Sequence, residues 1–217
     1  MTNSISELLQ ADGAELIRFV DISQLPPNQT QGFSKAIFFC LPVSREFILA
    51  KYNGEDTEHD DFLDKEHKAC IMSDRLAEYL EQKGYRAYSQ SDENNYQNGN
   101  FDEETQSSKL PHKTIARLAG IGFIGKNNLL ITEEYGCAFC MGTILTNAPV
   151  TTENFLPIAS QCGDCNVCKE TCPANAILGN EWSERGSRES TIDVLKCCCE
   201  LKCMVFCPYT LKYAKIA

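Results

Sequence analysis

The stretch that decides the fold is Cys162–Pro173, which reads CGDCNVCKETCP and spaces its cysteines as C-x2-C-x2-C-x3-C before a proline. Residues Cys203–Pro208, CMVFCP, repeat the closing half of this pattern. A triple cysteine, residues 197–199, lies just upstream of the repeat. Short turns between cysteines let successive sulfurs point inward, and each proline directs the chain away from them. The C-terminal part of the chain is therefore predicted to be organised by its sulfur atoms.

Two kinds of metal site compete for this pattern. In bacterial ferredoxins the same spacing holds 4Fe-4S cubes: three cysteines bind one cube, and the cysteine before the proline binds a second. A zinc ribbon instead uses two separated C-x2-C pairs to bind one tetrahedral ion. Zinc needs neither the third cysteine at the same interval nor the repeated Cys-Pro. We therefore predict two 4Fe-4S clusters, with zinc or disulfides as the alternative.

The crossover of ligands between two such cubes assigns the cysteines. Adjacent cysteines tend to point apart, which favours Cys197 and Cys199 over any pair that includes Cys198, although the choice within this triple stays open. The expected ligands are Cys162, Cys165, Cys168 and Cys207 for cluster 1, and Cys172, Cys197, Cys199 and Cys203 for cluster 2.

The use of cysteine points to a reducing compartment. The chain has 217 residues and 13 cysteines, and Met1–Ala14 lacks the basic-then-apolar pattern of a secretory signal. No segment approaches the ~18 uninterrupted apolar residues of a membrane span. We therefore expect a soluble, cytoplasmic protein without membrane contact, large enough for one sizeable core and a small appended domain.

The formal charge of −10 restricts the partners. Two oxidised cubes would add about −2 each, by addition of cluster and ligand charges. Such a field repels a phosphate backbone, whose binding depends on lysine and arginine, and it argues against a nucleic-acid partner. It is compatible with a basic redox partner protein as electron donor.

The chain is expected to divide near residues 147–154, into a cofactor and substrate domain (1–150) and a cluster domain (151–217). The polar, acidic segment Ser89–Ser108 is either a mobile loop or a lid. His59 and His67 are expected to face water. Apolar periodicity predicts helices at Ser4–Leu9, between Thr57 and Gly84, and from Pro111 to Gly120, and strands at Leu16–Ile22 and Ala36–Leu41.

Residues Gly120–Lys126, GIGFIGK, match the G-x-G-x-x-G pattern of dinucleotide sites. Such a site needs a strand, a glycine turn and then a helix, so that the helix N-terminus meets the phosphates. Here a predicted helix comes first and the β-prone Leu129–Thr132 follows. The order predicts a tight helix-to-strand connection, while close approach of some other ligand to this backbone stays open.

Five stretches together resemble the epoxyqueuosine reductase family and its shorter relatives with a double-cluster domain. They are residues 111–131, 134–136, 142–146, 162–177 and 207–210. The resemblance implies an α+β fold, with an N-terminal α/β, nitroreductase-like cofactor domain and a small C-terminal ferredoxin-type two-cluster domain. It also implies electron transfer from the two clusters to a corrinoid, cobalamin, and then to a small-molecule substrate.

Two positions depart from the family's pattern. The full-length reductases have a proton-donating aspartate about fourteen residues before the glycine that matches Gly120, and here that position is Gln106. Their second cysteine run is C-x2-C-x3-C-P, whereas Glu200 stands three residues before Cys203, so that one ligand is shifted by a position. The chain is also shorter than the full-length enzymes. These departures argue against a tRNA-modifying activity.

Three sets of residues outside the cluster segment have candidate roles. His112, at the start of its helix, is the candidate catalytic acid, with a partly exposed first-turn residue as the structural alternative. The remaining cysteines are expected in the core, with Cys137 or Cys140 facing the cofactor cavity as the alternative; they are Cys40, Cys70, Cys137 and Cys140. The candidate cofactor-binding residues, as a wall of the cofactor site, are Gly120, Gly122, Gly125, Lys126 and Asn127.

Two functions remain open. The first is an iron-sulfur oxidoreductase whose N-terminal domain binds a corrinoid or similar cofactor and a small substrate. The second is an electron carrier or reductive activator of a partner enzyme. An N-terminal domain of about 150 residues exceeds what a carrier needs, whereas Gln106 weakens the case for an enzyme. We favour the first.

Overall fold

The computed structural model describes residues 1–153 and 155–216. These residues form two compact units, and each unit combines segments that lie far apart in the sequence. Unit 1 comprises Met1–Pro42, Phe62–Ile121 and Cys140–Leu156, and unit 2 comprises Val43–Asp61, Gly122–Phe139 and Pro157–Ala217. The sequence predicted two consecutive domains with one boundary near residue 150. The units differ from that expectation because two N-terminal segments, 43–61 and 122–139, pack with the cysteine-rich segment.

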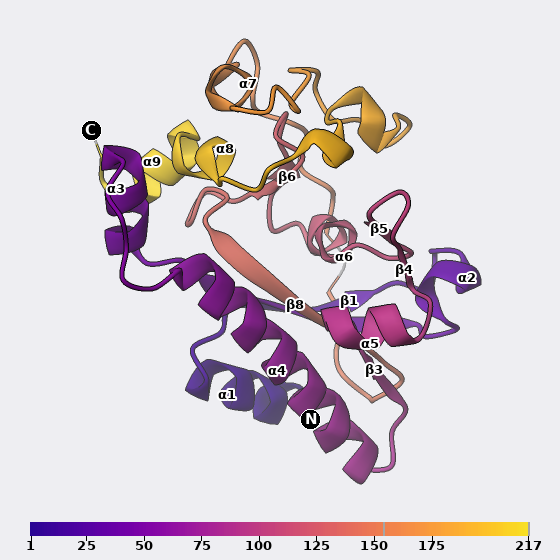
Figure 1. Cartoon of the computed structure of the whole chain (residues 1–217). Coiled ribbons are helices and arrows are strands. Elements are labelled where there is room, and N and C mark those ends of the chain that lie inside the picture. The colour runs from indigo at the N-terminus through magenta and orange to yellow at the C-terminus, as the bar shows by residue number, and fades with distance from the viewer. Residues whose placement is uncertain (154, 217) are drawn as a thin grey trace. The chain divides into compact units, whose positions relative to one another are not determined.

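Unit 1 is a mixed α/β unit built on a four-stranded sheet in the order β1-β2-β8-β3 (Figure 1). Strands β1 and β2 pair antiparallel, and so do β3 and β8. Its elements are α1 (Thr2–Ala11), β1 (Glu15–Asp21), α2 (Pro27–Thr30), β2 (Lys35–Pro42), α4 (Asp61–Gln82), β3 (Ala87–Ser89), α5 (Asp92–Gln97), β4 (Phe101–Asp102), β5 (Ser107–Ser108), α6 (His112–Leu118) and β8 (Phe139–Thr146).

Strand β2 is buried on both faces of the sheet, which its nearly continuous apolar sequence requires. Ile37, Phe39 and Leu41 belong to the main core of the unit, together with apolar residues of α1 and α4. The alternate residues, Ala36 to Cys40, are also fully buried and point to the opposite face, where α6 contacts β1 and β2. Helices α1 and α4 lie side by side in Figure 1, as their shared core requires.

Helix α4 is the long helix predicted from the sequence, but it begins at Asp61 rather than at Thr57. Its buried residues recur at helical spacing and include Met72, Leu76 and Leu80. Leu63 also falls in the apolar periodicity that predicted this helix, but it does not join the buried face, because 57% of its surface is exposed. The same helix carries His67 on its exposed surface, as expected, and His59 precedes it, also exposed.

The polar segment 89–108 is not a structureless loop. It contains helix α5 and the antiparallel pair of β4 and β5. Its asparagines replace apolar packing with hydrogen bonds: Asn95 Nδ2 donates to the carbonyl of Gln90 at 3.0 Å, and Asn100 Nδ2 donates to the hydroxyl of Tyr88 at 2.7 Å. Both asparagines are buried. The polarity of this segment therefore reflects an ordered hydrogen-bond network.

In unit 2, a small apolar cluster lies beside the cysteines. Its buried residues are Ala176, Ile177 and Ile192, and Cys168, Cys172 and Cys203 pack against them. The elements of unit 2 are α3 (Arg45–Asn53), β6 (Phe123–Ile124), β7 (Leu130–Ile131), α7 (Val167–Thr171), two 3-10 turns (Arg188–Ser190 and Val194–Lys196), α8 (Lys202–Val205) and α9 (Pro208–Ala214).

The two C-terminal helices are fixed by the earlier segments of unit 2. Helix α3 contacts both α8 and α9 (Figure 1). The ring centroids of Tyr52 and Phe206 lie 5.2 Å apart. The hydroxyl of Tyr213 donates a hydrogen bond to the carbonyl of Val43 at 2.9 Å. These contacts explain why residues 43–61 group with a segment more than a hundred residues away. No helix in the described part of the chain is long and apolar enough to cross a membrane.

Candidate functional site

Four cysteines of unit 2 line one cavity of about 110 Å³. They are Cys162, Cys165, Cys168 and Cys207, the set expected for cluster 1, and we call them the first cysteine group. Lys126, Asn127, Ile131 and Tyr209 contribute to the same lining. The fold thus brings Cys207 to the first three cysteines although about forty residues separate them in the sequence.

The thiols of the first cysteine group influence one another electrostatically. Burial, followed by the nearby Cys162 and Cys207, raises the pKa of the Cys168 thiol to about 11. Gathering several thiolates in one place is unfavourable unless a cation compensates their charge. Metal binding supplies that compensation and releases the protons. The group is therefore suited to a cationic inorganic centre.

The second cysteine group comprises Cys172, Cys197, Cys199 and Cys203. Burial, followed by the nearby Cys197, Cys168 and Cys172, raises the pKa of the Cys203 thiol to about 12. The sulfurs of Cys197 and Cys199 lie 3.9 Å apart. Cys199 has a φ of +52°, a left-handed conformation that is uncommon for a residue with a side chain. The structure thus brings Cys172, Cys197 and Cys203 near one another, with Cys199 beside Cys197.

A 4Fe-4S cube places its thiolates at separate corners, so its ligands surround a volume rather than a point. The four thiols of the first cysteine group surround one cavity in this way. The residues of this group therefore fit a cube.

Cys207 is held in place by a segment that the sequence did not link to the clusters. It is the residue before helix α9, and its pKa is lowered to about 7 by a hydrogen bond from the Cys137 thiol and then by the backbone amides of Tyr209 and Thr210. The backbone amide of Cys137 donates to the Thr210 hydroxyl at 3.2 Å. A side chain at Gly136, whose φ is +59°, would collide with the backbone of Thr210. This packing holds the Cys207 thiol in surroundings that favour the thiolate.

The glycine-rich segment 120–127 crosses the sequence boundary between the two units, which falls after Ile121. Helix α6 precedes the segment, β6 lies within it and β7 follows, so the predicted helix-to-strand connection is confirmed and the order differs from that of a phosphate-binding loop. A side chain at Gly122 would collide with the carbonyl of Ile131, its partner across that pair. A Cβ at Gly120 would lie 2.6 Å from the Cβ of Phe155. Packing within each unit is therefore sufficient to explain why positions 120 and 122 are glycine.

The two polar residues of the same segment face the cysteines. Lys126 and Asn127 both line the cavity of the first cysteine group and both are buried. Asn127 Nδ2 donates to the carbonyl of Cys203 at 3.1 Å and to the Cys137 sulfur at 3.6 Å. These residues had been predicted to contact a cofactor in the N-terminal domain. The structure gives them a second candidate partner, the cluster.

His112 is part of a buried hydrogen-bond chain in unit 1. Gln90 Nε2 donates to the carbonyl of Leu110 at 2.8 Å, which leaves Gln90 Oε1 as the acceptor of the Thr143 hydroxyl at 2.6 Å. The Thr143 oxygen lies 2.6 Å from His112 Nδ1. Because the hydroxyl proton is already donated, Nδ1 must carry the proton of this bond. Burial lowers the pKa of His112, against the opposing charge of Asp92.

The hydrogen-bond chain predicts a neutral His112 with its proton on Nδ1, which suits a hydrogen-bond acceptor at Nε2 better than the acid expected from the sequence. We expect ¹H–¹⁵N correlation spectra at pH 7 to show this tautomer, in the resonances that disappear in His112→Gln. Thr143→Val should abolish the preference, because it removes the acceptor for Nδ1. A charged ring or a proton on Nε2 at pH 7 would contradict the assignment.

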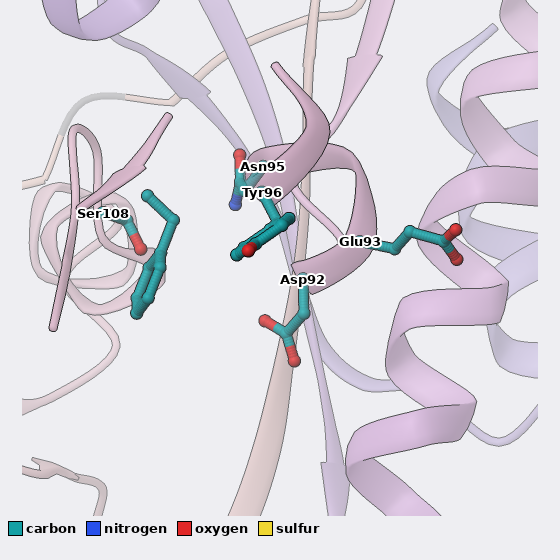
Figure 2. A pocket seen from close by; sticks show the side chains of 6 residues that line it. Asp92, Glu93, Asn95, Tyr96 and Ser108 are labelled. Carbon is teal, nitrogen blue, oxygen red and sulfur yellow. The ribbon is translucent and has the colours of Figure 1, made fainter. Parts of the chain in front are cut away.

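An open pocket of about 350 Å³ lies beside helix α5 in unit 1. Figure 2 shows Asp92 and Tyr96 of α5 on the side of the pocket that faces Ser108, whereas Glu93 points away from them. Asn95 and Phe101 complete the lining. Sites for small molecules have volumes of ~300–1,000 Å³. The pocket is therefore large enough for a small ligand.

The four cysteines outside the C-terminal cysteine-rich segment mostly behave as core residues. Cys40 and Cys140 are buried in unit 1, and Cys140 Sγ donates to the carbonyl of Phe62 at 3.3 Å. Cys70 is only half-buried, and burial raises its pKa to about 11. Cys137 is buried in unit 2 beside Cys207, a role that sequence spacing did not suggest. The sequence hinted at this contact in one way: residues 134–136 and 207–210 both belong to the stretches that resemble the epoxyqueuosine reductase family.

Gln106 occupies the turn between β4 and β5. Its φ is +51°, and its side-chain amide donates to the carbonyl of Glu103 at 2.7 Å. A side-chain amide can donate a hydrogen bond but does not ionise at neutral pH. Gln106 therefore cannot transfer a proton as an aspartate at this position would.

Comparison with known proteins gives partial sequence matches and nearly complete structural ones. No protein-family model matches the chain. An epoxyqueuosine reductase of Aliivibrio fischeri is 30% identical over 109 residues, 50% of this chain and 24% of that protein. One of Listeria monocytogenes is 41% identical over 73 residues, 34% of this chain and 19% of that protein. The matches thus span a quarter or less of the length of these curated relatives.

The structural matches cover almost the whole chain at low identity. The structure of epoxyqueuosine reductase from Streptococcus thermophilus matches with a TM-score of 0.60 and 16% identity, over 97% of this chain and 66% of that one. A catabolic reductive dehalogenase matches with a TM-score of 0.67 and 18% identity, over 98% and 32%. Another dehalogenase structure, with a TM-score of 0.64 and 18% identity over 89% and 28%, is described with a mechanism for B12-dependent dehalogenation. These likenesses establish a shared mixed α/β fold.

One structural relative bears on the expected partners. An epoxyqueuosine reductase solved with an epoxyqueuosine-modified tRNA stem loop matches with a TM-score of 0.58 and 16% identity, over 96% of this chain and 64% of that one. Our expectation from charge argued against a nucleic-acid partner for this chain, whereas that reductase, which shares the fold, was solved with one.

Proposed function

We propose that this chain, a relative of the epoxyqueuosine reductases, is an iron-sulfur oxidoreductase of the corrinoid-dependent type. The first and second cysteine groups would each hold one 4Fe-4S cluster. Electrons would enter from a redox partner protein, pass through the clusters and reach a cofactor and a small substrate associated with unit 1. The cytoplasmic location predicted from cysteine use belongs to the same proposal.

The observation that carries this proposal is the gathering of Cys162, Cys165, Cys168 and Cys207 around one cavity. Their order along the chain follows the ferredoxin crossover, in which the last cysteine returns to the first three. Two groups of reductases share the fold that presents these cysteines. A chain used only as an electron carrier would need unit 2 but not unit 1, which has its own core and pocket.

The corrinoid itself is inferred from the fold and is not assigned to particular contacts. Neither the 350 Å³ pocket of unit 1 nor the 110 Å³ cavity of unit 2 is large enough to enclose a corrin macrocycle with its side chains. A bound corrinoid would supply a cobalt centre that exchanges electrons with the clusters. We keep the prediction from the sequence that residues 120–127 form part of the wall of the cofactor site. The pocket beside α5 is our candidate for the small substrate.

Cobalamin binding is the experiment that tests this function. Titrating the anaerobic, cluster-loaded chain with cobalamin should give saturable binding, and reduction of the clusters should then change the visible spectrum of the bound cobalamin. Flavin mononucleotide under the same conditions is the control and should not bind. A modified tRNA stem loop and small organic substrates would next be compared as electron acceptors. Binding of neither cobalamin nor flavin would favour the electron carrier instead.

The electron carrier, or reductive activator, is kept as a second candidate because of one observation. Gln106 stands where the resemblance implies a proton-donating aspartate, and its amide is engaged with the carbonyl of Glu103. A protein that only relays electrons has no need of a proton donor. Under this alternative the cysteine groups would have the same role, and no substrate would turn over on the chain.

A further inference from the structure

We propose that Lys126 is the counter-charge of cluster 1 and raises the reduction potential of that cluster. This inference rests on the proposed function, in that the first cysteine group must hold a 4Fe-4S cluster. It adds a tuning residue to the site that is not a ligand and that no sequence pattern identifies.

Lys126 contacts the loop that supplies the ligands of cluster 1. Its Nζ donates a hydrogen bond to the carbonyl of Gly163 at 2.7 Å and lies 3.4 Å from Asn166 Oδ1. These two residues follow Cys162 and Cys165 directly in the sequence. The lysine also lines the cavity that the four cysteines surround. All of these contacts lie within unit 2.

The burial of Lys126 calls for a negative charge. Only 6% of its surface is exposed, and lysine is almost never buried to this degree without a charged partner. Both of its hydrogen-bond acceptors are neutral oxygens. Among the described residues, no carboxylate forms an ion pair with it. An isolated buried ammonium is unfavourable, so the missing charge must come from the contents of the cavity.

A 4Fe-4S cluster with four thiolates supplies that charge. The oxidised cluster carries about −2 by addition of its charges, and each added electron makes it more negative. A fixed ammonium nearby stabilises the reduced form more than the oxidised form, because the attraction grows with the negative charge. Local net charge and hydrogen bonding are among the factors that set cluster potentials. Lys126 should therefore raise the potential of cluster 1.

The lysines near the second cysteine group are different. Lys196 pairs with Asp193 at 2.8 Å and Lys202 with Glu200 at 3.6 Å, and both lysines are about half or more exposed. Their charges are compensated and screened by water, so these two lysines should have little effect on a nearby cluster. Because Lys126 contacts the ligand loop of cluster 1 and lines its cavity, we expect its effect on that cluster.

Three variants separate the charge of Lys126 from its hydrogen bonds. Lys126→Gln keeps a donor and removes the charge, and Lys126→Arg keeps both. Lys169→Gln is the matched control, because Lys169 also neighbours a ligand cysteine, Cys168, and is exposed to water. Each full-length variant would be purified anaerobically, analysed for iron and sulfide, and titrated electrochemically while the reduced clusters are followed by EPR.

We expect Lys126→Gln to keep the full iron content and to shift one of the two potentials to a more negative value. The other potential should not move, Lys126→Arg should stay close to the wild type, and Lys169→Gln should change neither potential. Full iron with both potentials unmoved in Lys126→Gln would overturn the inference. If Lys126→Gln instead loses one cluster, Lys126→Arg decides: retention of that cluster supports the counter-charge, and its loss overturns it. Wild-type protein that binds no iron would refute the proposed function itself.

Discussion

Cys165→Ala should remove about half of the iron from the protein, leaving roughly four irons of eight, because cluster 1 would keep only three of its four thiolate ligands. Cys165 belongs to the first cysteine group, whose members line a common cavity. The apolar cluster beside the cysteines contains three buried residues, Ala176, Ile177 and Ile192. A segment packed on so small a cluster depends on its metal for stability, so we also expect the cysteine-rich segment of unit 2 to unfold.

A matched control for this variant is Cys70→Ala. Cys70 lies on α4 in unit 1, is half-buried and belongs to neither cysteine group. It should keep the full iron content and the visible absorption of the wild type. Iron, acid-labile sulfide and far-ultraviolet circular dichroism, measured on anaerobic samples, give both readouts. An undiminished iron content in Cys165→Ala would remove that residue from the ligand set.

The second large effect concerns the register of the cysteine triple. Cys203→Ser should lose one cluster, whereas Cys198→Ser should keep both. The Cys203 thiol lies among those of Cys197, Cys168 and Cys172, which together with burial raise its pKa to about 12. The sulfur of Cys197 lies 3.9 Å from that of Cys199. We therefore expect Cys198 to be the member of the triple that is not a ligand.

Cys199→Ser completes this test and should behave like Cys203→Ser, with about four irons lost. The serine substitution keeps the size of the side chain, so a loss of iron reports on the ligand rather than on packing. Retention of both clusters in Cys199→Ser together with loss of one in Cys198→Ser would shift the ligand by one residue. The positive φ of Cys199 would then need another explanation.

Local elements of the fold could be predicted because their signals are local. Strand β2 follows from its apolar run, and α4 from its helical periodicity, apart from four residues at its start. The division into units could not be predicted, because it depends on contacts such as that between Tyr213 and Val43, which are far apart in sequence. The order in residues 89–108 was missed because buried asparagines carry it, and their hydrogen bonds leave no apolar pattern.

The candidate site was predictable to the extent that spacing encodes it. Ligand spacing anticipated the first cysteine group, including the return of Cys207. Spacing says nothing of Lys126, Asn127 or Cys137, which reach the cysteines through the packing of residues 122–139 against the C-terminal segment. The state of His112 likewise follows from a hydrogen-bond chain through Thr143 and Gln90 that only the fold assembles.

The two-cluster assignment is tested most directly by the inorganic content of the wild-type chain purified without oxygen. Two cubes require about eight irons and eight sulfides per chain, with EPR signals of reduced 4Fe-4S clusters after addition of dithionite. We expect this stoichiometry. Stoichiometric zinc with no iron and no visible absorption would refute the assignment.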